Sequence, residues 1–400
     1  SRGRWHYGAM FLPISDAPNP KVMPIATWAI IAVNIAAFIL INLPLGMQPA
    51  DTSDPAFVEY LEFLARFVDS RQELSAVAGQ VSAYDLFVFK HGYRPAAPSV
   101  FDLLFSLFLH GGLLHLAGNM LFLWIYGDNV EHRLGPLPFV FWYLTAGVAA
   151  TLFHAVFFLG SNVPLVGASG AISGVLGFYF VWFPRNTVRV LFFLPPFFWH
   201  VFEIPARIVL GIYLVIDNFL PFLFAGAGGV AYGAHIGGFL AGAGAAFVMA
   251  RRATSRRAGE IGAPEHAPKP SAIRDALQQG RFEEAAAEYF ALPTAEARRA
   301  LSPDQALLLA RRLRAAGHAN AALALLQRVI QSAPRGADLA ELHALVGLIL
   351  LEDQHDISGA YQYLATAMRL GPSAATTATV ARALASIEAR QRLHPGRFRR

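Results

Sequence analysis

The sequence has no cysteine and few charged residues. The absence of cysteine excludes disulfide bonds, thiol nucleophiles and cysteine-ligated metal centres. Only 15% of the 400 residues are charged and 55% are hydrophobic, whereas ordinary soluble domains carry about 25% charged residues. This composition is too apolar for a protein that is soluble over its whole length.

The charges are also unevenly distributed along the chain. Residues 1–250 carry 24 of the 59 charged side chains, and residues 251–400 carry the other 35. We therefore predict an N-terminal segment (1–22), a membrane domain (23–250), a linker (251–270) and a soluble helical domain (271–400). The net charge of +5 comes from arginines mixed with acids, without an aromatic-lined basic stripe, so we expect no nucleic-acid partner.

Six stretches are long and apolar enough for membrane spans, which need about 20 residues each. They cover residues 23–43, 103–126, 137–159, 168–183, 206–224 and 230–250. The apolar stretch 190–202 is short and contains Pro195-Pro196, which indicates an interfacial or re-entrant connection. The predicted fold is all-α: a polytopic six-span helical bundle followed by a soluble α-helical repeat domain.

The positions of lysine and arginine predict the orientation of these spans, because such residues are retained on the cytoplasmic side. If the chain has six spans, the basic residues near the span ends all lie on one side of the membrane, which is then the cytoplasmic side. They are Arg2, Arg4, Lys21, Arg133, Arg185, Arg189, Arg251, Arg252, Arg256 and Arg257. We expect a multi-pass cell-membrane protein with both termini in the cytoplasm. The acidic loop 48–100 and the short loops 160–166 and 225–229 would lie outside.

Polar groups are rare inside membrane spans and usually functional, and four of those in the predicted spans matter most here. His115 and Asn119 share one helix face, Ser169 opens the fourth span, and His235 lies near the start of the sixth. The predicted topology puts all four at similar depth, in the outer part of the membrane. Together they suit nucleophilic acyl transfer, with Ser169 as nucleophile and His235 as its base. Asn119, His115 and the Ser169 N–H would stabilise the oxyanion.

Small residues around these positions favour close helix packing. Gly170 and Gly174 are four apart, as are Gly233 and Gly237, and Gly238 and Gly242. His110 lies about 140° around a continuous helix from His115, so we assign it a structural role off that face. Glu131 and Arg133 suit helix capping or an ion pair in a loop, and the acid Asp217 in the fifth span has no assigned role.

Four motifs in order resemble the rhomboid family of intramembrane serine proteases, over residues 23–250. They are His110-Gly-Gly-Leu-Leu-His115-Leu-Ala-Gly-Asn119, Tyr126-Gly127 with Glu131 and Gly135, Gly167-Ala168-Ser169-Gly170, and Ala234-His235-Ile236-Gly237-Gly238. The resemblance implies a catalytic dyad of Ser169 and His235 without a third carboxylate, metal or other cofactor. It further implies an oxyanion hole of His115, Asn119 and the Ser169 N–H, shaped by Gly167, with His110, Glu131, Gly170, Gly237 and Gly238 in support.

The same resemblance implies a substrate class and a topology. The substrates would be single-span membrane proteins cleaved within or near the lipid bilayer, at a site that opens toward the extracytoplasmic side. The long first outer loop would lie partly in the membrane, and the fifth span would act as a lateral gate.

The sequence also departs from the family pattern at two positions. Tyr93-Arg94 stands where many members carry Trp-Arg in the first outer loop, which leaves the anchoring of that loop open. Ser173 stands where some members carry an aromatic residue that packs on the catalytic histidine. Another group must therefore hold the His235 ring.

The soluble region shows a helical repeat. A set of four residues recurs 38 positions later: Ala322, Leu326, Val329 and Pro334 become Ala360, Leu364, Ala367 and Pro372. A weaker copy of the pattern follows Gly280, just as the copy at Ala322 follows Gly317. The pattern is similar to tetratricopeptide repeats, whose period is about 34. It predicts a small solenoid that binds an unidentified cytoplasmic partner or mediates homo-oligomerisation; a generic helical bundle is the alternative.

Two other functions compete with an intramembrane protease. One is a membrane adaptor that binds membrane proteins without cleaving them, against which the presence of both Ser169 and His235 argues. The other is a transporter, which would want a charged pathway or matching broken helices, and Asp217 alone gives poor support. The sequence has no His-Glu-x-x-His motif for a zinc protease and no pair of intramembrane aspartates.

Overall fold

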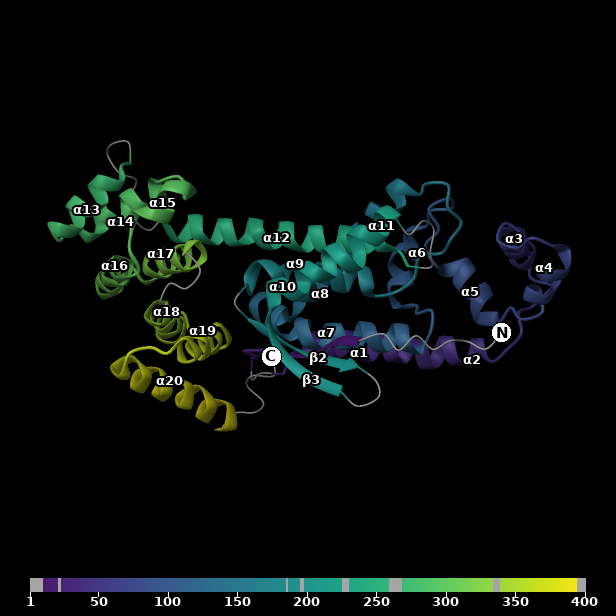
Figure 1. The fold of residues 1–400 in the computed structure, drawn as a ribbon, viewed down its shortest axis with the longest axis horizontal. Helices are drawn as coiled ribbons and strands as arrows, with labels where there is room; N and C mark the ends of the chain where they lie inside the picture. The colour runs from purple at the N-terminus through teal and green to yellow at the C-terminus, as the bar shows by residue number, and fades with distance from the viewer. Residues whose placement is uncertain are drawn as a thin grey trace. The chain divides into compact units, whose positions relative to one another are not determined.

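The computed structural model describes residues 10–20, 23–184, 186–194, 198–224, 230–258, 268–333 and 339–393. Several features singled out above lie outside these residues: Arg2, Arg4, Lys21, Arg185, Pro195, Pro196, Pro334, the loop 225–229 and residues 259–267 of the linker. The chain divides into two compact units (Figure 1). We call Ser1–Ala17 with Pro24–Ala246 the membrane unit, and Phe247–Arg400, which groups with Pro18–Met23, the tail.

The membrane unit contains the apolar helices. Its elements are β1 (Met10–Ala17), α1 (Ile25–Ala37), η1 (Phe38–Asn42), α2 (Leu43–Gly46), α3 (Pro55–Leu64), α4 (Arg71–Ala78), α5 (Ala83–His91), α6 (Val100–Phe105), η2 (Ser106–Phe108), α7 (Leu113–Leu134), α8 (Pro136–Phe157), α9 (Ser169–Trp182), β2 (Thr187–Leu194), β3 (Phe198–Pro205), α10 (Ala206–Leu214), η3 (Val215–Phe219), α11 (Leu220–Phe224) and α12 (Tyr232–Ala258), which continues into the tail.

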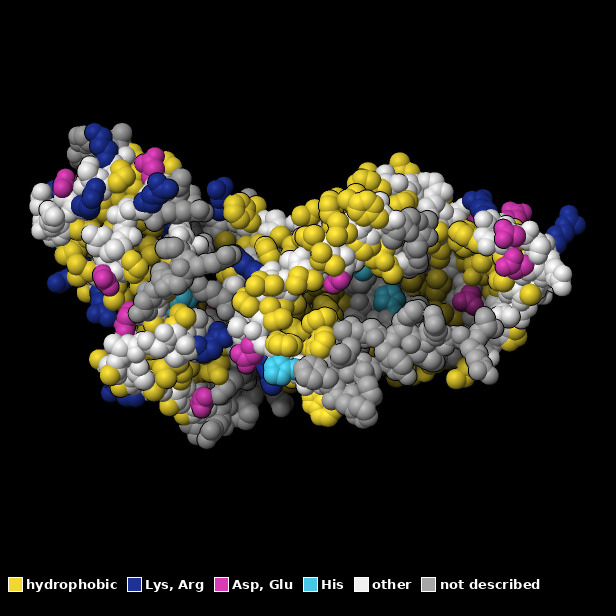
Figure 2. Space-filling model, in the orientation of Figure 1, with side chains coloured by type: hydrophobic (Ala, Val, Ile, Leu, Met, Phe, Trp, Pro, Cys, Tyr) yellow, Lys and Arg dark blue, Asp and Glu magenta, His cyan; other side chains and the backbone are white. Residues whose placement is uncertain are grey.

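The predicted helical membrane bundle with a helical tail is confirmed. Within the part of the chain that the structure describes, four helical segments are long and apolar enough to cross a membrane: Ile25–Gly46, Pro136–Phe157, Ala206–Phe224 and Tyr232–Arg251. A bent pair, Val100–Phe108 with Leu113–Leu134, would make a fifth, and the apolar α9 is shorter. Hydrophobic side chains gather over the described part of the bundle that Figure 2 shows, whereas charged side chains gather on the tail and at the opposite end of the view, on the loop 48–100.

The second predicted span begins later than the sequence suggested. The chain bends by 87° between Val100–Phe108 and Leu113–Leu134, so α7 starts at Leu113 and not near residue 103. Gly112 precedes α7 with a φ of +157°. His110 lies in this bend, and its ring meets the His115 ring edge-on at 5.2 Å between centroids. The expectation that these two rings lie apart on one continuous helix was therefore wrong.

The mostly helical fold also contains a three-stranded antiparallel sheet, and residues 190–194 and 198–202, where we expected an interfacial or re-entrant connection, fall in its strands β2 and β3. Strand β2 lies between β1 and β3, with Phe192 opposite Phe11 on one side and His200 on the other. The N-terminal segment is thus partly a strand. Its Asp16 accepts hydrogen bonds from Tyr179 on α9 and from Asn129 on α7 (2.8 Å for Asn129), which ties the sheet to the bundle.

Helix α9 forms the centre of the membrane unit. Ten of its fourteen residues are buried, from Gly170 to Tyr179. It packs against α7, α8 and α10, and the backbone of α12 lies against its glycines. The residue that begins α9, Ser169, is therefore held on a rigid, buried element.

The tail consists of helices packed as successive hairpins. They are α13 (Pro270–Gln278), α14 (Phe282–Ala291), α15 (Thr294–Ala300), α16 (Pro303–Ala315), α17 (Ala319–Ser332), α18 (Ala340–Glu352), α19 (Ile357–Leu370) and α20 (Ala374–Leu393). Neighbouring helices pack as α13 with α14, α16 with α17, and α18 with α19. Their apolar faces form one continuous core.

The 38-residue repeat recurs in the helix boundaries. Helices α17 and α19 begin and end 38 residues apart, at Ala319–Ser332 and Ile357–Leu370. The turns before α14 and α17 contain Gly280 (φ +71°) and Gly317 (φ +89°), and the matching turn before α19 contains His355 (φ +54°). A left-handed conformation suits glycine and strains histidine, so His355 occupies a glycine position of the repeat.

Candidate active site

Ser169 and His235 lie against each other in the membrane unit. Ser169 is the first residue of α9, and His235 is in the first turn of α12. The Nε2 atom of His235 is 2.8 Å from Ser169 Oγ. Since the serine hydroxyl can donate only if Nε2 is unprotonated, this geometry suits a base poised to take the serine proton.

The other ring nitrogen of His235 has a partner that the sequence did not reveal. Its Nδ1 is 2.6 Å from Oδ1 of Asn218, which lies in the π-helical turn η3 and is 1% exposed. Asn218 in turn donates from Nδ2 to the carbonyl oxygen of Tyr213, at 2.7 Å. The neighbouring acid Asp217, which the sequence made conspicuous, is exposed.

Tyr213 on α10 packs near the His235 ring. The two rings are 6.4 Å apart between centroids, with planes 30° apart. The Tyr213 hydroxyl hydrogen-bonds Ser173 Oγ at 2.7 Å. Position 173 thus lacks an aromatic side chain of its own, but the Ser173 hydroxyl binds Tyr213, whose ring comes from another helix and lies near the His235 ring.

His115 and Asn119 face the turn that precedes Ser169. Gly167 has a φ of +120°, and a Cβ there would come within 2.8 Å of His115 Cε1 and 3.8 Å of Asn119 Nδ2. Asn119 is 8% exposed, yet its Nδ2 has no hydrogen-bond partner among the described residues. A buried donor without a partner is costly, so its presence beside Ser169 points to a ligand atom that it would serve.

The tautomer of His115 follows from its other nitrogen. The Gly111 N–H donates to His115 Nδ1 at 3.3 Å, so Nδ1 carries the lone pair and Nε2 carries the hydrogen in the neutral ring. His115 Nε2 therefore presents a donor on the same side as Asn119.

A small cavity adjoins Ser169. Its volume is about 30 Å³, and its lining includes Ser169, Gly170, Thr151, Leu165 and Ala234. A space of this size holds about one water molecule or a small side chain. The site therefore joins a hydroxyl and an imidazole in hydrogen-bond contact, an unpaired amide donor and a small cavity.

Comparison with known proteins identifies this region. The family model described as Rhomboid domain matches residues 97–252. The chain carries a rhomboid domain. The rhomboid protease GluP of Bacillus subtilis is 45% identical over 75 residues, which is 19% of this chain and 14% of that protein.

More distant relatives match over longer stretches. RHOMBOID-like protein 4 of Arabidopsis thaliana is 33% identical over 147 residues, covering 35% of this chain and 32% of that protein. Rhomboid protein 1, mitochondrial, of Saccharomyces cerevisiae is 32% identical over 145 residues, covering 34% and 38%. The chain spans less than two fifths of the length of each of these relatives. Together with its apolar helices, this relationship makes the chain a multi-pass membrane protein.

Glycines bring the two helices of the rhomboid domain that carry Ser169 and His235 into backbone contact. A Cβ on Gly238 would overlap the carbonyl oxygen of Gly170, and one on Gly242 would overlap that of Gly174. A Cβ on Gly237 would overlap Phe153 of α8. The separation between the Ser169 hydroxyl and the His235 imidazole thus depends on this close packing.

Glu131 and His110 lie at opposite ends of α7. The Glu131 carboxylate accepts the backbone N–H groups of Ala26 (2.9 Å) and Thr27 (2.7 Å) and so caps the start of α1, which lacks a side-chain cap of its own. The His110 carbonyl accepts from Tyr84 Oη (2.7 Å) and Asn42 Nδ2 (2.9 Å). These contacts fix the bend from which α7 rises.

The loop 48–100 of the membrane unit is anchored through the Tyr93-Arg94 pair. Tyr93 forms a β-bridge with Leu165, two residues before Gly167. The Arg94 guanidinium pairs with Glu59 (2.5 Å) and lies 4.3 Å from the centre of the Phe89 ring. This pair therefore connects the outer loop helices to the loop that leads into Ser169.

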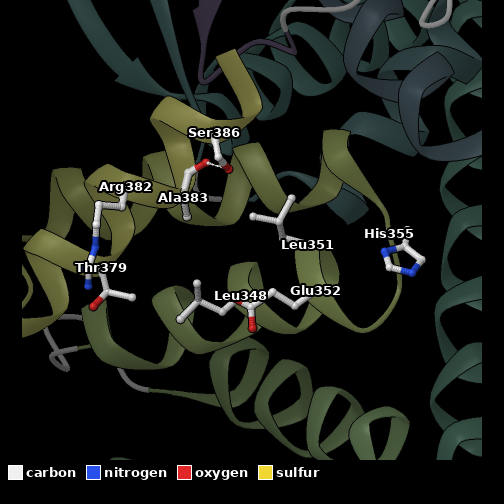
Figure 3. Close-up of a pocket in the computed structure, with 8 residues that line it drawn as sticks. All are labelled: Leu348, Leu351, Glu352, His355, Thr379, Arg382, Ala383 and Ser386. Atoms are coloured by element: carbon white, nitrogen blue, oxygen red, sulfur yellow. Dashed lines mark hydrogen bonds between the residues drawn. The ribbon is translucent and has the colours of Figure 1, made fainter. Parts of the chain in front are cut away.

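The tail has a larger groove of its own between α18 and α20 (Figure 3). Its volume is about 520 Å³, and it is lined by Leu348, Leu351, Glu352, His355, Thr379, Arg382, Ala383 and Ser386. Glu352 already pairs with Arg314 at 2.6 Å. The groove is thus lined by both apolar and polar side chains of the tail.

Proposed function

We propose that the rhomboid domain is a serine endopeptidase that cleaves single-span membrane proteins within or near the bilayer. The observation that carries this proposal is the 2.8 Å approach of His235 Nε2 to Ser169 Oγ. The relatives named above are rhomboid proteins, and one of them is called a protease. The alternative of a non-cleaving adaptor leaves a nucleophile and a base in hydrogen-bond contact unused.

The proposed reaction proceeds through an acyl-enzyme. Ser169 Oγ attacks the scissile carbonyl carbon while His235 Nε2 accepts the hydroxyl proton. The C–N bond then breaks, and His235 gives that proton to the leaving amine. A water molecule, deprotonated by the same nitrogen, attacks the acyl carbon; the ester bond to Ser169 Oγ then breaks, and His235 returns the proton to Oγ as the new carboxyl end leaves.

The oxyanion of each tetrahedral intermediate would be bound by three donors. Asn119 Nδ2, His115 Nε2 and the Ser169 backbone N–H are the candidates, and Gly167 leaves the space that the oxygen needs. Preorganised donors of this kind stabilise developing negative charge most strongly where water is excluded. The unpaired state of Asn119 Nδ2 supports this role.

The small cavity suggests a preference at the cleavage site. A volume of about 30 Å³ beside Ser169 admits a side chain such as that of alanine or serine and excludes an aromatic ring. We therefore expect cleavage after small residues. The proposed topology places both termini in the cytoplasm and opens this site toward the extracytoplasmic side.

Reporter cleavage in liposomes tests the proposed activity. The full chain is reconstituted with a single-span reporter that has a helix-breaking segment, and products are followed by mass spectrometry. Cleavage by the wild type that is lost in Ser169→Ala and in His235→Ala is the expected result. Binding of the reporter without cleavage by folded wild-type protein would support the adaptor instead.

For the tail, we propose that its helical repeats bind a cytoplasmic partner or mediate homo-oligomerisation. The tail has a groove between α18 and α20, and its lining includes Arg382 and the apolar side chains of Leu348 and Leu351 (Figure 3). Deleting residues 271–400 should leave cleavage of a minimal reporter intact and alter partner choice or oligomeric state. Loss of cleavage of the minimal reporter would contradict this modular division.

A further inference from the structure

The catalytic base needs a defined tautomer, and the dyad alone does not supply one. His235 accepts a proton from Ser169 only if Nε2 carries the lone pair, which requires the hydrogen on Nδ1. In serine proteases a third group that accepts from Nδ1 holds this tautomer. The rhomboid domain has no carboxylate at this position, where Asn218 lies instead.

The hydrogen bonds of Asn218 define the orientation of its amide. Nδ2 points to the Tyr213 carbonyl oxygen at 2.7 Å, and a carbonyl oxygen can only accept. The amide nitrogen must therefore face Tyr213, which turns Oδ1 toward His235 Nδ1 at 2.6 Å. Since Oδ1 can only accept, Nδ1 must carry the hydrogen, and Nε2 is left free to receive the serine proton.

The local helix geometry explains why Asn218 reaches this place. Residues Val215–Phe219 form a π-helical turn between α10 and α11, a rare distortion that often occurs at functional sites. Within this turn Asn218 is 1% exposed, while the neighbours Ile216, Asp217 and Phe219 are exposed. Of the five residues of this turn, Asn218 is the one that is buried in the interior of the domain.

From this geometry we infer that Asn218 is a positioning residue that fixes the tautomer and orientation of His235 through the chain Tyr213 carbonyl, Asn218 amide, His235 imidazole and Ser169 hydroxyl. Asn218 does not touch the substrate. The inference rests on the proposed peptidase function. The segment α10–η3–α11 would thus hold the His235 ring in the state that can activate Ser169, although Ser169 and His235 themselves lie on α9 and α12.

A matched control exists in the first span. Asn34 is also a fully buried asparagine within an apolar helix, and its Nδ2 donates to a carbonyl of the same helix, that of Ile30, at 2.8 Å. A purely structural role predicts that losing either asparagine has the same kind of effect. A positioning role predicts that only the change at 218 affects the reactivity of Ser169.

The test compares Asn218→Leu, Asn218→Asp and Asn34→Leu with the wild type in detergent micelles. For each, the rate of Ser169 labelling by a fluorophosphonate, the kcat and KM for a reporter, and the thermal unfolding midpoint are measured. Asn218→Leu should lower the labelling rate and kcat by about 10²-fold with unchanged KM, less than the ~10⁴-fold that a wrong tautomer costs a Ser-His-Asp triad. Asn218→Asp, which keeps an acceptor for Nδ1, should recover most of the loss.

The outcomes separate this inference from the proposed function. If the wild type is not labelled and does not cleave, the proposed function fails. If the wild type is active and Asn218→Leu is labelled at the wild-type rate, the positioning role is refuted. It is also refuted if the labelling rate of Asn218→Leu is lowered no more than that of Asn34→Leu. If Asn218→Leu unfolds, the Asn218→Asp variant provides the test instead. A folded Asn218→Asp protein whose kcat is about 10²-fold below that of the wild type would refute the positioning role.

Discussion

The contact between α9 and α12 should respond sharply to a single methyl group at Gly238. In Gly238→Ala the new Cβ would overlap the carbonyl oxygen of Gly170 and lie 3.3 Å from the Ala150 Cβ. The Gly170 backbone cannot move without moving the adjacent Ser169. The two helices must therefore separate, and the 2.8 Å contact between Ser169 Oγ and His235 Nε2 lengthens with them.

The magnitude can be worked out against a control on the same helix. Overpacking a close contact costs about 1–3 kcal/mol, while alanine gains about 0.5–1 kcal/mol of helix propensity over glycine. Gly244 of α12 has nothing within 4 Å of its Cβ position, so Gly244→Ala takes the propensity gain alone. Gly238→Ala should be less stable than Gly244→Ala by about 1–3 kcal/mol. A displacement of about 1 Å at the dyad should slow acylation by about 10²-fold.

Unfolding in mixed micelles and fluorophosphonate labelling of Ser169 measure the two effects. We expect Gly244→Ala to label at the wild-type rate and to unfold at the same or higher denaturant fraction. A Gly238→Ala protein with wild-type stability and wild-type labelling would refute the reasoning that this backbone contact sets the dyad geometry.

Three further predictions concern other parts of the chain. Asn119→Ala should lower kcat/KM for a reporter by about 10²–10³-fold without changing the unfolding midpoint, as expected for loss of an oxyanion donor; a change below threefold would remove it from that role. Glu131→Ala should lower the free energy of unfolding by about 2–4 kcal/mol because two backbone N–H groups of α1 lose their partner, whereas exposed Glu203→Ala should change it by less than about 0.5 kcal/mol. His355→Gly should raise the unfolding temperature of the tail, by relieving about 1 kcal/mol of left-handed strain, and a lower temperature would contradict the repeat alignment.

The features that the sequence predicted are those set by local pattern. Apolar length predicted the helices, and the rarity of polar groups in spans selected His115, Asn119, Ser169 and His235, which the structure brings to one place. Capping was one of the two roles expected for Glu131, although the helix that it caps belongs to another span. Each of these inferences needed only the chemistry of a short window.

The features that were missed depend on contacts between distant segments. Strand β1 pairs with β2 about 175 residues later in the chain, and the Pro195-Pro196 pair made the apolar stretch 190–202 look like a membrane-surface connection instead of a hairpin. Asn218 lies beside the more conspicuous Asp217, and its burial depends on a π-helical turn that has no sequence signal of its own. The polar pair Asp217-Asn218 in an apolar span was the available sequence signal, but the charge of Asp217 made it the more conspicuous of the two residues.

Covalent labelling of Ser169 tests the central claim most directly. Folded full-length protein in lipid is treated with a fluorophosphonate, and the modified residue is located by mass spectrometry of peptides, beside Ser169→Ala and Ser173→Ala. The account predicts a phosphonyl adduct on Ser169 in the wild type and in Ser173→Ala, and none in Ser169→Ala. An unmodified Ser169 in folded wild-type protein, or an adduct confined to another serine, would contradict it.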